Sequence, residues 1–295
     1  MTSRRNIRLE LSYDGTDFAG WQRQSGDRSV QGELEAALAR MHGRAVGVVG
    51  AGRTDSGVHA MGQVANFYTD IASIPAGKFV PALNRLLPRD VRVLSARDAD
   101  IDFHARYDAR VRRYRYFVVC GQSDPFRLRY AHQLFRRPSV AALDAMAALL
   151  VGENDFTTFS SARDRSANRS RYVHDASWRW EGGALLFEVA ANAFLWRMVR
   201  SLVGSMLHYE AASRGSPDAA RARMADALGS RDRGAAGPTA PACGLFLWNV
   251  EYYAAPTRPG RAARYLDREA VRVTSPDSGA DDEAPPLEAE GAEDM

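Results

Sequence analysis

Strand-like and helix-like patterns follow one another in a similar order in residues 1–108 and in residues 109–255. In the first stretch, alternating hydrophobicity predicts strands over residues 7–13, 45–49, 62–68 and 91–94. Helical spacing predicts a helix over residues 29–41, capped by Ser29, and a second helix that begins between Pro75 and Pro81 and reaches residue 87. The resulting order is strand, helix, strand, strand, helix, strand.

The second stretch repeats this order loosely. Strands are predicted over residues 110–120, 174–180, 185–190 and 245–253, and helices over residues 140–151, 194–209 and 218–228. Helices and strands that mix without strict alternation are typical of α+β proteins. We therefore expect two similar α+β halves, 1–108 and 109–255, with mainly antiparallel sheets flanked by helices and the active-site cleft between them.

The charge is divided unevenly along the chain. The formal net charge is +3, but residues 271–295 hold eight acidic residues and one basic residue, so the remaining 270 residues carry +10. A basic body indicates a polyanionic partner. From Ser275 onward Asp, Glu, Ala, Pro and Gly dominate, a composition that buries too little apolar surface to fold. We expect residues 256–295 to form a disordered acidic tail.

Several classes of protein are excluded or disfavoured. No run of about 18 apolar residues could span a membrane, and the first residues lack the apolar segment of a signal peptide, which favours the cytoplasm. Cys120 and Cys243 are expected as free thiols, although a disulfide between them is possible. The chain has no Walker loop, no Cys-x-x-Cys and no zinc-ligand spacing, so we expect neither cofactor nor metal.

The densest chemical signal is the run Gly50-Ala-Gly-Arg-Thr-Asp-Ser-Gly-Val-His-Ala60, directly after a predicted strand. Its glycines permit sharp turns that display Arg53 and Asp55. A dinucleotide loop is disfavoured, because Asp55 stands where the third glycine belongs and would repel a pyrophosphate. Two interpretations stay open: a structural turn in which Asp55 pairs with Arg53, or a catalytic carboxylate with a nearby arginine.

A second signal is the run Arg112-Arg-Tyr-Arg-Tyr-Phe117. On a strand Arg113 and Arg115 share one face, and Tyr114 and Tyr116 share the other. The run suits base stacking beside phosphate neutralisation. It equally suits a pair of core tyrosines with solvated arginines.

A third signal is Arg200, in the helix predicted over residues 194–209. Helical spacing places Arg200 on one stripe with Trp196, Gly204 and Leu207, so we expect it to be partly buried. An arginine removed from water needs a carboxylate partner. The alternative is an arginine whose head extends to the surface.

Together these signals resemble the tRNA pseudouridine synthase A family. The resemblance covers roughly residues 7–253, and its matching segments, in the family's order, are Tyr13-Asp-Gly-Thr-Asp-Phe-Ala-Gly-Trp-Gln-Arg-Gln24, Gly52-Arg-Thr-Asp-Ser-Gly-Val-His59, Asp102-Phe-His-Ala-Arg106, Arg112-Arg-Tyr-Arg-Tyr116, Gly152-Glu-Asn-Asp-Phe-Thr157, and Asn192-Ala-Phe194 with Met198-Val-Arg-Ser-Leu-Val-Gly204. The chain departs from the family at Trp196-Arg197, where relatives carry histidines.

The resemblance implies a role for each matched residue. Asp55 matches the catalytic aspartate, Tyr114 the tyrosine that stacks on the target base, and Arg200 the arginine that pairs with the catalytic carboxylate. Arg53 matches the arginine thought to help displace the base from the RNA. The resemblance also implies isomerisation of uridines 38, 39 and 40 in the tRNA anticodon stem-loop by a homodimer without cofactor or metal.

The residues are consistent with that chemistry. Breaking the N1–C1′ bond of uridine and joining C5 to C1′ requires a nucleophile or base at the ribose, and Asp55 can supply it if a guanidinium keeps it ionised in a closed pocket. Tyr114 can also take the C5 proton as a general base. The alternative is a non-catalytic RNA-binding module of the same fold, but a binder has no need of an acid in a basic groove. A metal-dependent nuclease would need several clustered carboxylates.

Overall fold

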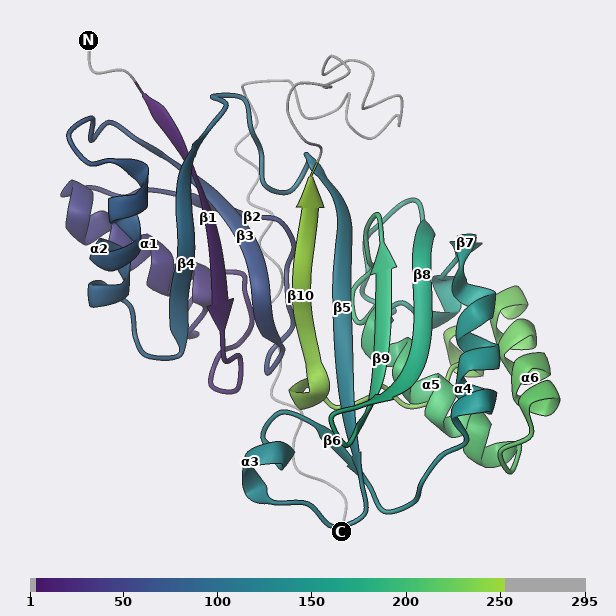
Figure 1. The fold of residues 1–295 in the computed structure, drawn as a ribbon. Coiled ribbons are helices and arrows are strands. Elements are labelled where there is room, and N and C mark those ends of the chain that lie inside the picture. Colours follow the sequence, from purple (N-terminus) through teal and green to yellow (C-terminus); the bar gives the residue numbers. More distant parts are fainter. Residues whose placement is uncertain (1–3, 253–295) are drawn as a thin grey trace.

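A single sheet of ten strands crosses the computed structural model, which describes residues 4–252 (Figure 1). The order across the sheet is β4-β1-β3-β10-β5-β9-β8-β7, with β2 paired to β3 and β6 paired to β5. The strands are β1 (Arg5–Tyr13), β2 (Val48–Gly50), β3 (His59–Thr69), β4 (Val91–Ala99), β5 (Ala109–Cys120), β6 (His132–Leu134), β7 (Gly152–Asp155), β8 (Ser170–Glu181), β9 (Ala184–Ala191) and β10 (Leu245–Tyr252).

Four of the helices begin close to the positions that the sequence predicts, one begins later, as described below, and the short helix at 125–128 was not predicted. They are α1 (Val30–His42), α2 (Phe79–Leu86), α3 (Pro125–Leu128), α4 (Val140–Ala147), α5 (Met198–Ala212) and α6 (Pro217–Ser230). The Ser29 side chain accepts a hydrogen bond from the Gly32 N–H at the start of α1, and Gly43 ends that helix in the left-handed conformation, with φ +67°. The α+β class is confirmed.

The two halves share one sheet, whereas the sequence predicts a sheet in each half. Pairing is mainly antiparallel, as expected, and among the described strands only β3–β10 and β5–β6 are parallel. The two halves share one sheet because β10 lies between β5 and β3, where it places Phe246 opposite His59. The division at residues 108 and 109 stays a prediction. The expected tail, 256–295, lies outside the described residues.

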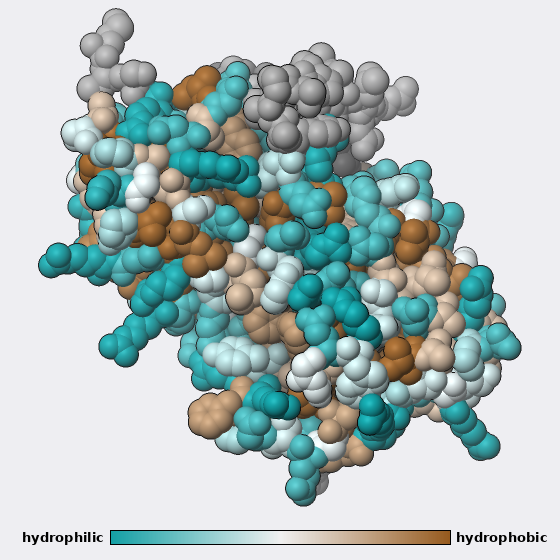
Figure 2. All heavy atoms as spheres, in the orientation of Figure 1, coloured by the Kyte–Doolittle hydropathy of each residue, from teal (hydrophilic) through white to brown (hydrophobic). Residues whose placement is uncertain are grey.

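The two faces of the sheet differ. On one face Phe67 packs edge-on against Phe79 of α2, and the indole N–H of Trp178 lies 3.4 Å from the sulfur of Met206 in α5. One hydrophobic cluster extends across both halves on this side. No helix of the described part crosses the other face of the central strands (Figure 1). The sphere view in that orientation shows hydrophobic and hydrophilic side chains mixed over the surface (Figure 2).

Three further features bear on function. No helix within residues 4–252 is long and apolar enough to cross a membrane. Cys120 and Cys243 are free thiols, as expected. Over the same residues, no group of three or more His, Cys, Asp or Glu side chains could hold a metal ion.

Candidate active site

Asp55 lies on a tight loop, residues 51–58, between β2 and β3; we call this segment the Asp55 loop. Its ends are closed by backbone hydrogen bonds, from Ala51 N–H to the Val64 carbonyl (2.7 Å) and from Val58 N–H to the Asp55 carbonyl (3.1 Å). Gly57 has φ +74°, a left-handed conformation that glycine adopts without strain. The glycine frame therefore serves the turn that displays Asp55, as the sequence predicts.

A second segment, residues 14–21, supports the Asp55 loop from outside. Trp21 N–H donates to the Thr54 carbonyl (3.0 Å), and Gly57 N–H donates to the Phe18 carbonyl (3.3 Å). Gly20 has φ +116°, and a Cβ there would lie 2.5 Å from the Thr54 oxygen. Only glycine allows this approach, so the 14–21 segment is a backbone support for the loop.

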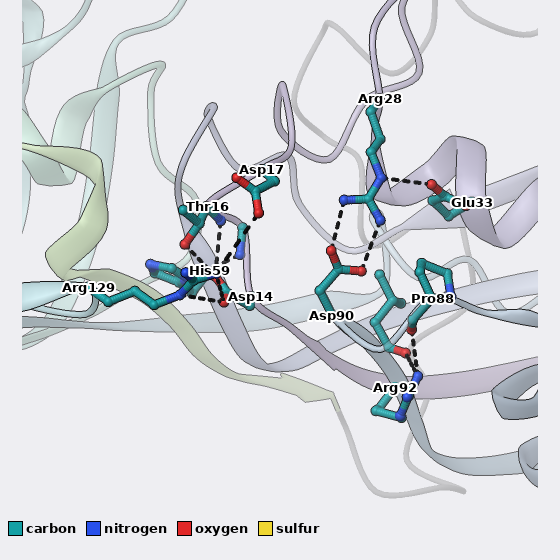
Figure 3. A network of polar contacts seen from close by, with 12 residues as sticks. Asp14, Thr16, Asp17, Arg28, Glu33, His59, Pro88, Asp90, Arg92 and Arg129 are labelled. Carbon is teal, nitrogen blue, oxygen red and sulfur yellow. Dashed lines mark hydrogen bonds and ion pairs between the residues drawn. The ribbon is translucent and has the colours of Figure 1, made fainter. Parts of the chain in front are cut away.

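Asp14 anchors the supporting segment at its start (Figure 3). Its carboxylate accepts hydrogen bonds from Thr16, from Arg129 Nη2 (2.9 Å) and from the Tyr130 hydroxyl (2.9 Å). Burial by itself would raise the pKa of Asp14, but these hydrogen bonds outweigh it and lower that pKa well below its usual range. Asp14 is therefore ionised at neutral pH and ties the 14–21 segment to the second half of the chain.

Arg28 anchors the chain beyond this segment (Figure 3). Its guanidinium donates two hydrogen bonds to Asp90 (2.8 and 3.0 Å) and one to Glu33 (3.0 Å), and it lies 4.1 Å from the centre of the Phe18 ring. Bidentate arginine–carboxylate pairs are the more specific kind of ion pair. The support for the Asp55 loop is thus fixed on both sides.

Arg200 of α5 contacts Asp55 directly. Arg200 Nη1 lies 3.2 Å from Asp55 Oδ2, and the exposed fractions of the two side chains are 15% and 21%. Arg200 Nε also donates to the Ala240 carbonyl (2.8 Å), while Ala240 N–H donates to the Arg200 carbonyl (3.0 Å). The partial burial and the carboxylate partner predicted for Arg200 are confirmed. The sequence also leaves open a structural turn in which Asp55 pairs with Arg53. The Arg53 side chain is exposed on the loop, two residues before Asp55.

The helix that carries Arg200 begins later than the sequence predicts. It starts at Met198 rather than at residue 194, because Arg197 adopts the left-handed conformation with φ 61°. Trp196 N–H donates instead to Asp164 Oδ2 (2.6 Å). Trp196 therefore does not share the helical stripe of Arg200, and that part of the prediction is wrong. Gly204 does lie on α5.

Tyr114 of β5 lies within electrostatic reach of Asp55. It is 8% exposed, and its ring meets the ring of Phe194 edge-on at 5.0 Å. Burial raises the pKa of the Tyr114 hydroxyl, and the negative charge of Asp55 raises it further. Tyr114 is therefore a neutral phenol at physiological pH, which suits a stacking ring better than a general base.

The arginines that flank Tyr114 serve another purpose. Arg113 pairs with Asp175 (2.8 Å) and Glu188 (3.2 Å), and Arg115 also pairs with Glu188. Tyr116 is fully buried on the opposite side of β5. The alternation of faces is confirmed, but both arginines bind carboxylates rather than lying beside Tyr114 as phosphate ligands.

Sequence reasoning missed two contacts of this site. The buried Tyr13 hydroxyl lies 2.8 Å from Thr54 Oγ1, next to Asp55. Arg112, two residues before Tyr114 on the same face, donates to the Ala51 carbonyl (3.0 Å). Strand alternation could have shown that Arg112 lies on the same face as Tyr114. The sequence holds no signal for its partner, because that partner is a backbone carbonyl.

Two hollows among the described residues lie away from the predicted active-site cleft. The structure shows one hollow of about 630 Å³ beside β2 and one of about 720 Å³ near Phe246, and neither includes Asp55, Tyr114 or Arg200. Asp55 and Arg200 already touch, and Tyr114 is nearly buried. The cleft stays a prediction.

Comparison with known proteins places the chain among the pseudouridine synthases. The sequence model of a family described as tRNA pseudouridine synthase matches residues 11–108 and 146–253. The chain belongs to this family. A relative named tRNA pseudouridine synthase A in Treponema denticola is 46% identical over 85% of this chain and 94% of its own length. Relatives of the same name in Halalkalibacterium halodurans and Bacillus subtilis are 43% and 41% identical, over 82% and 83% of this chain and 90% and 98% of their own lengths.

Gly204 offers a test of the segment that holds Arg200. A Cβ at Gly204 would lie 1.8 Å from the Pro238 oxygen and 2.9 Å from Ala240 N. Gly204→Ala should therefore push this segment away and lower the unfolding free energy by roughly 1–3 kcal/mol. Gly229 in α6 is the matched control, because nothing lies within 4 Å of its Cβ position. Urea unfolding should show Gly229→Ala to be neutral or up to about 1 kcal/mol stabilising; equal effects of the two substitutions would contradict the close approach.

Asp14 gives a test by pH. A carboxyl whose pKa is lowered on folding contributes stability that is present above its unfolded value, near 3.9, and is lost as pH falls through the folded value. The difference in unfolding free energy between wild type and Asp14→Asn should therefore be largest near pH 7 and shrink below about pH 4. Asp17→Asn, on an exposed side chain near the same Arg129, is the control. A difference for Asp14→Asn that does not change between pH 7 and pH 2 would argue against the network.

Proposed function

We propose that this chain isomerises uridine to pseudouridine at positions 38, 39 and 40 of the tRNA anticodon stem-loop, in the cytoplasm. The observation that supports it most is the 3.2 Å contact between Asp55 and Arg200, with Tyr114 close by. Membership of the tRNA pseudouridine synthase family and the relatives named tRNA pseudouridine synthase A point to tRNA as the substrate.

Asp55 is the group proposed to begin the chemistry. The N1–C1′ bond breaks, a C5–C1′ bond forms, C5 loses its proton and N1 gains one, so the product is an isomer of the substrate. The Asp55 carboxylate serves by attack on C1′, by attack on C6 or by removal of the 2′ proton. Arg200 Nη1 lies 3.2 Å from the carboxylate and fixes its direction. The isomerisation is redox-neutral, so we propose that it needs neither cofactor nor metal.

Tyr114 and Arg53 are proposed to handle the displaced nucleoside. A uridine must leave its stack to reach Asp55, and this costs a few kcal/mol. Stacking on an aromatic ring returns about 1–3 kcal/mol, which the neutral ring of Tyr114 can supply. Arg53 is exposed on the same loop as Asp55, and we propose that it helps to displace the base. The basic residues of the body attract the phosphates, and binding should therefore weaken as salt rises.

Asp55→Asn tests the proposed function. Release of tritium from tRNA that carries 5-tritiated uridine should fall at least about 100-fold, because the amide cannot act as nucleophile or base. Binding of tRNA, followed by filter retention, should change little. Asp175→Asn is the control, since this carboxylate pairs with Arg113 on the other face of β5. Equal release by wild type and Asp55→Asn would remove Asp55 from the mechanism, and no release by wild type would overturn the function.

The family resemblance also supports a homodimer, which we propose as the working assembly. Met61 of β3 and Leu94 of β4 are about half exposed, at 47% and 51%. Light scattering of the purified protein should give twice the chain mass of 32.5 kDa at micromolar concentration. A mass of a single chain under the same conditions would overturn the assembly but not the proposed chemistry.

A further inference from the structure

Arg112 makes an unusual set of contacts for a strand arginine. Its guanidinium donates five hydrogen bonds, all to backbone carbonyl oxygens. Nε and Nη2 both reach Ala51 (3.3 and 3.0 Å), and Nη2 also reaches Arg106 (2.6 Å). Nη1 reaches Ala109 (3.1 Å) and Asn192 (2.5 Å). A single planar group therefore fixes the backbone at four positions.

These carbonyls belong to the segments that carry the site. Ala51 is the first residue of the Asp55 loop. Asn192 directly follows β9, on the path to α5 and Arg200. Arg106 and Ala109 lie at the connection between β4 and β5, where the first half of the chain passes into the second. Arg112 thus links the backbone of the Asp55 loop to the segment that leads to its partner.

Arg112 also stands beside Tyr114 in the sheet. The two residues lie two positions apart on β5, and their partners on β9 are Ala191 and Val189. Residues two apart share a face. The positive charge of Arg112 acts on the Tyr114 hydroxyl, where it opposes the rise in pKa that burial causes. The guanidinium therefore lies within electrostatic reach of a site group.

We propose that Arg112 is a positioning residue for the isomerisation, holding the Asp55 loop and the segment before α5 at the separation that lets Arg200 meet Asp55. The assignment rests on the proposed function, because it gives Arg112 an effect only through Asp55 and Arg200. Lysine cannot replace it, since a single ammonium lacks the planar fork of donors that reaches four carbonyls.

Arg113 supplies a matched control. It is the next residue on β5, its side chain is 22% exposed, and it binds Asp175 and Glu188 on the opposite face. Arg112→Met and Arg113→Met remove the same charge and the same donors from neighbouring positions. Only the first removes contacts with the backbone of the site.

The first measurement is steady-state tritium release with tRNA as the probe. Arg112→Met should lower kcat about 10- to 100-fold, the scale expected for a misplacement of about 1 Å, while KM changes less than about threefold. Arg112→Lys should recover little of the loss, and Arg113→Met should stay within about threefold of wild type. Thermal unfolding of each variant reports whether it is folded, and if Arg112→Met does not fold, Arg112→Lys alone decides by its kcat.

The second measurement is a double-mutant cycle with Arg200→Lys. If Arg112 acts through the Asp55–Arg200 contact, the effects of Arg112→Met and Arg200→Lys on kcat should be clearly less than additive. The cycle of Arg113→Met with Arg200→Lys should be additive. Additive effects in both cycles, or an unchanged kcat for Arg112→Met, would overturn the proposal. Failure of the proposed function would appear separately, as the absence of tritium release by the wild-type protein.

Discussion

The ion pair between Asp55 and Arg200 is the contact on which the site depends. One partner lies on a loop before β3 and the other on α5, 145 residues further along the chain. The pair forms only if the two halves meet in one arrangement, and the continuous sheet provides that arrangement. The β10 strand pairs with both β3 and β5, so it fixes the first half against the second. If the two halves formed separate sheets, they could move relative to each other, and the contact between Asp55 and Arg200 could break.

Backbone hydrogen bonds rather than side-chain packing set the position of Asp55. The 14–21 segment holds the loop through Thr54 and Gly57, while Asp14 and Arg28 fix that segment at its two sides. Arg112 holds the start of the same loop from β5. A carboxylate that must meet a reacting carbon needs such support, since a displacement of about 1 Å can cost as much as 100-fold in rate. The supporting groups are spread over both halves of the chain.

Much of this arrangement could be predicted from local chemistry. The Ser29 cap and Gly43 delimit α1 because both act within a few residues. Local chemistry favoured a carboxylate partner for Arg200, because a buried guanidinium needs one, but the identity of that partner, Asp55, was implied only by the family resemblance. The start of α5 was not predictable, since Trp196 donates its N–H to Asp164, 32 residues away. The joining of the two halves into one sheet and the contacts of Arg112 were not predictable either, because their partners are distant in the sequence. Neither a neighbouring strand nor a backbone carbonyl is marked by a particular type of residue.

The most direct measurement is a crystal structure of the protein with a tRNA anticodon stem-loop bound. We expect one uridine to be turned out of the stem-loop, with its base on the ring of Tyr114 and its C1′, its C6 or its C2′ within about 3.5 Å of the Asp55 carboxylate. Arg200 should remain in contact with that carboxylate. A bound stem-loop whose uridines all lie far from Asp55, or a complex in which Arg200 has left Asp55 exposed to solvent, would contradict the account.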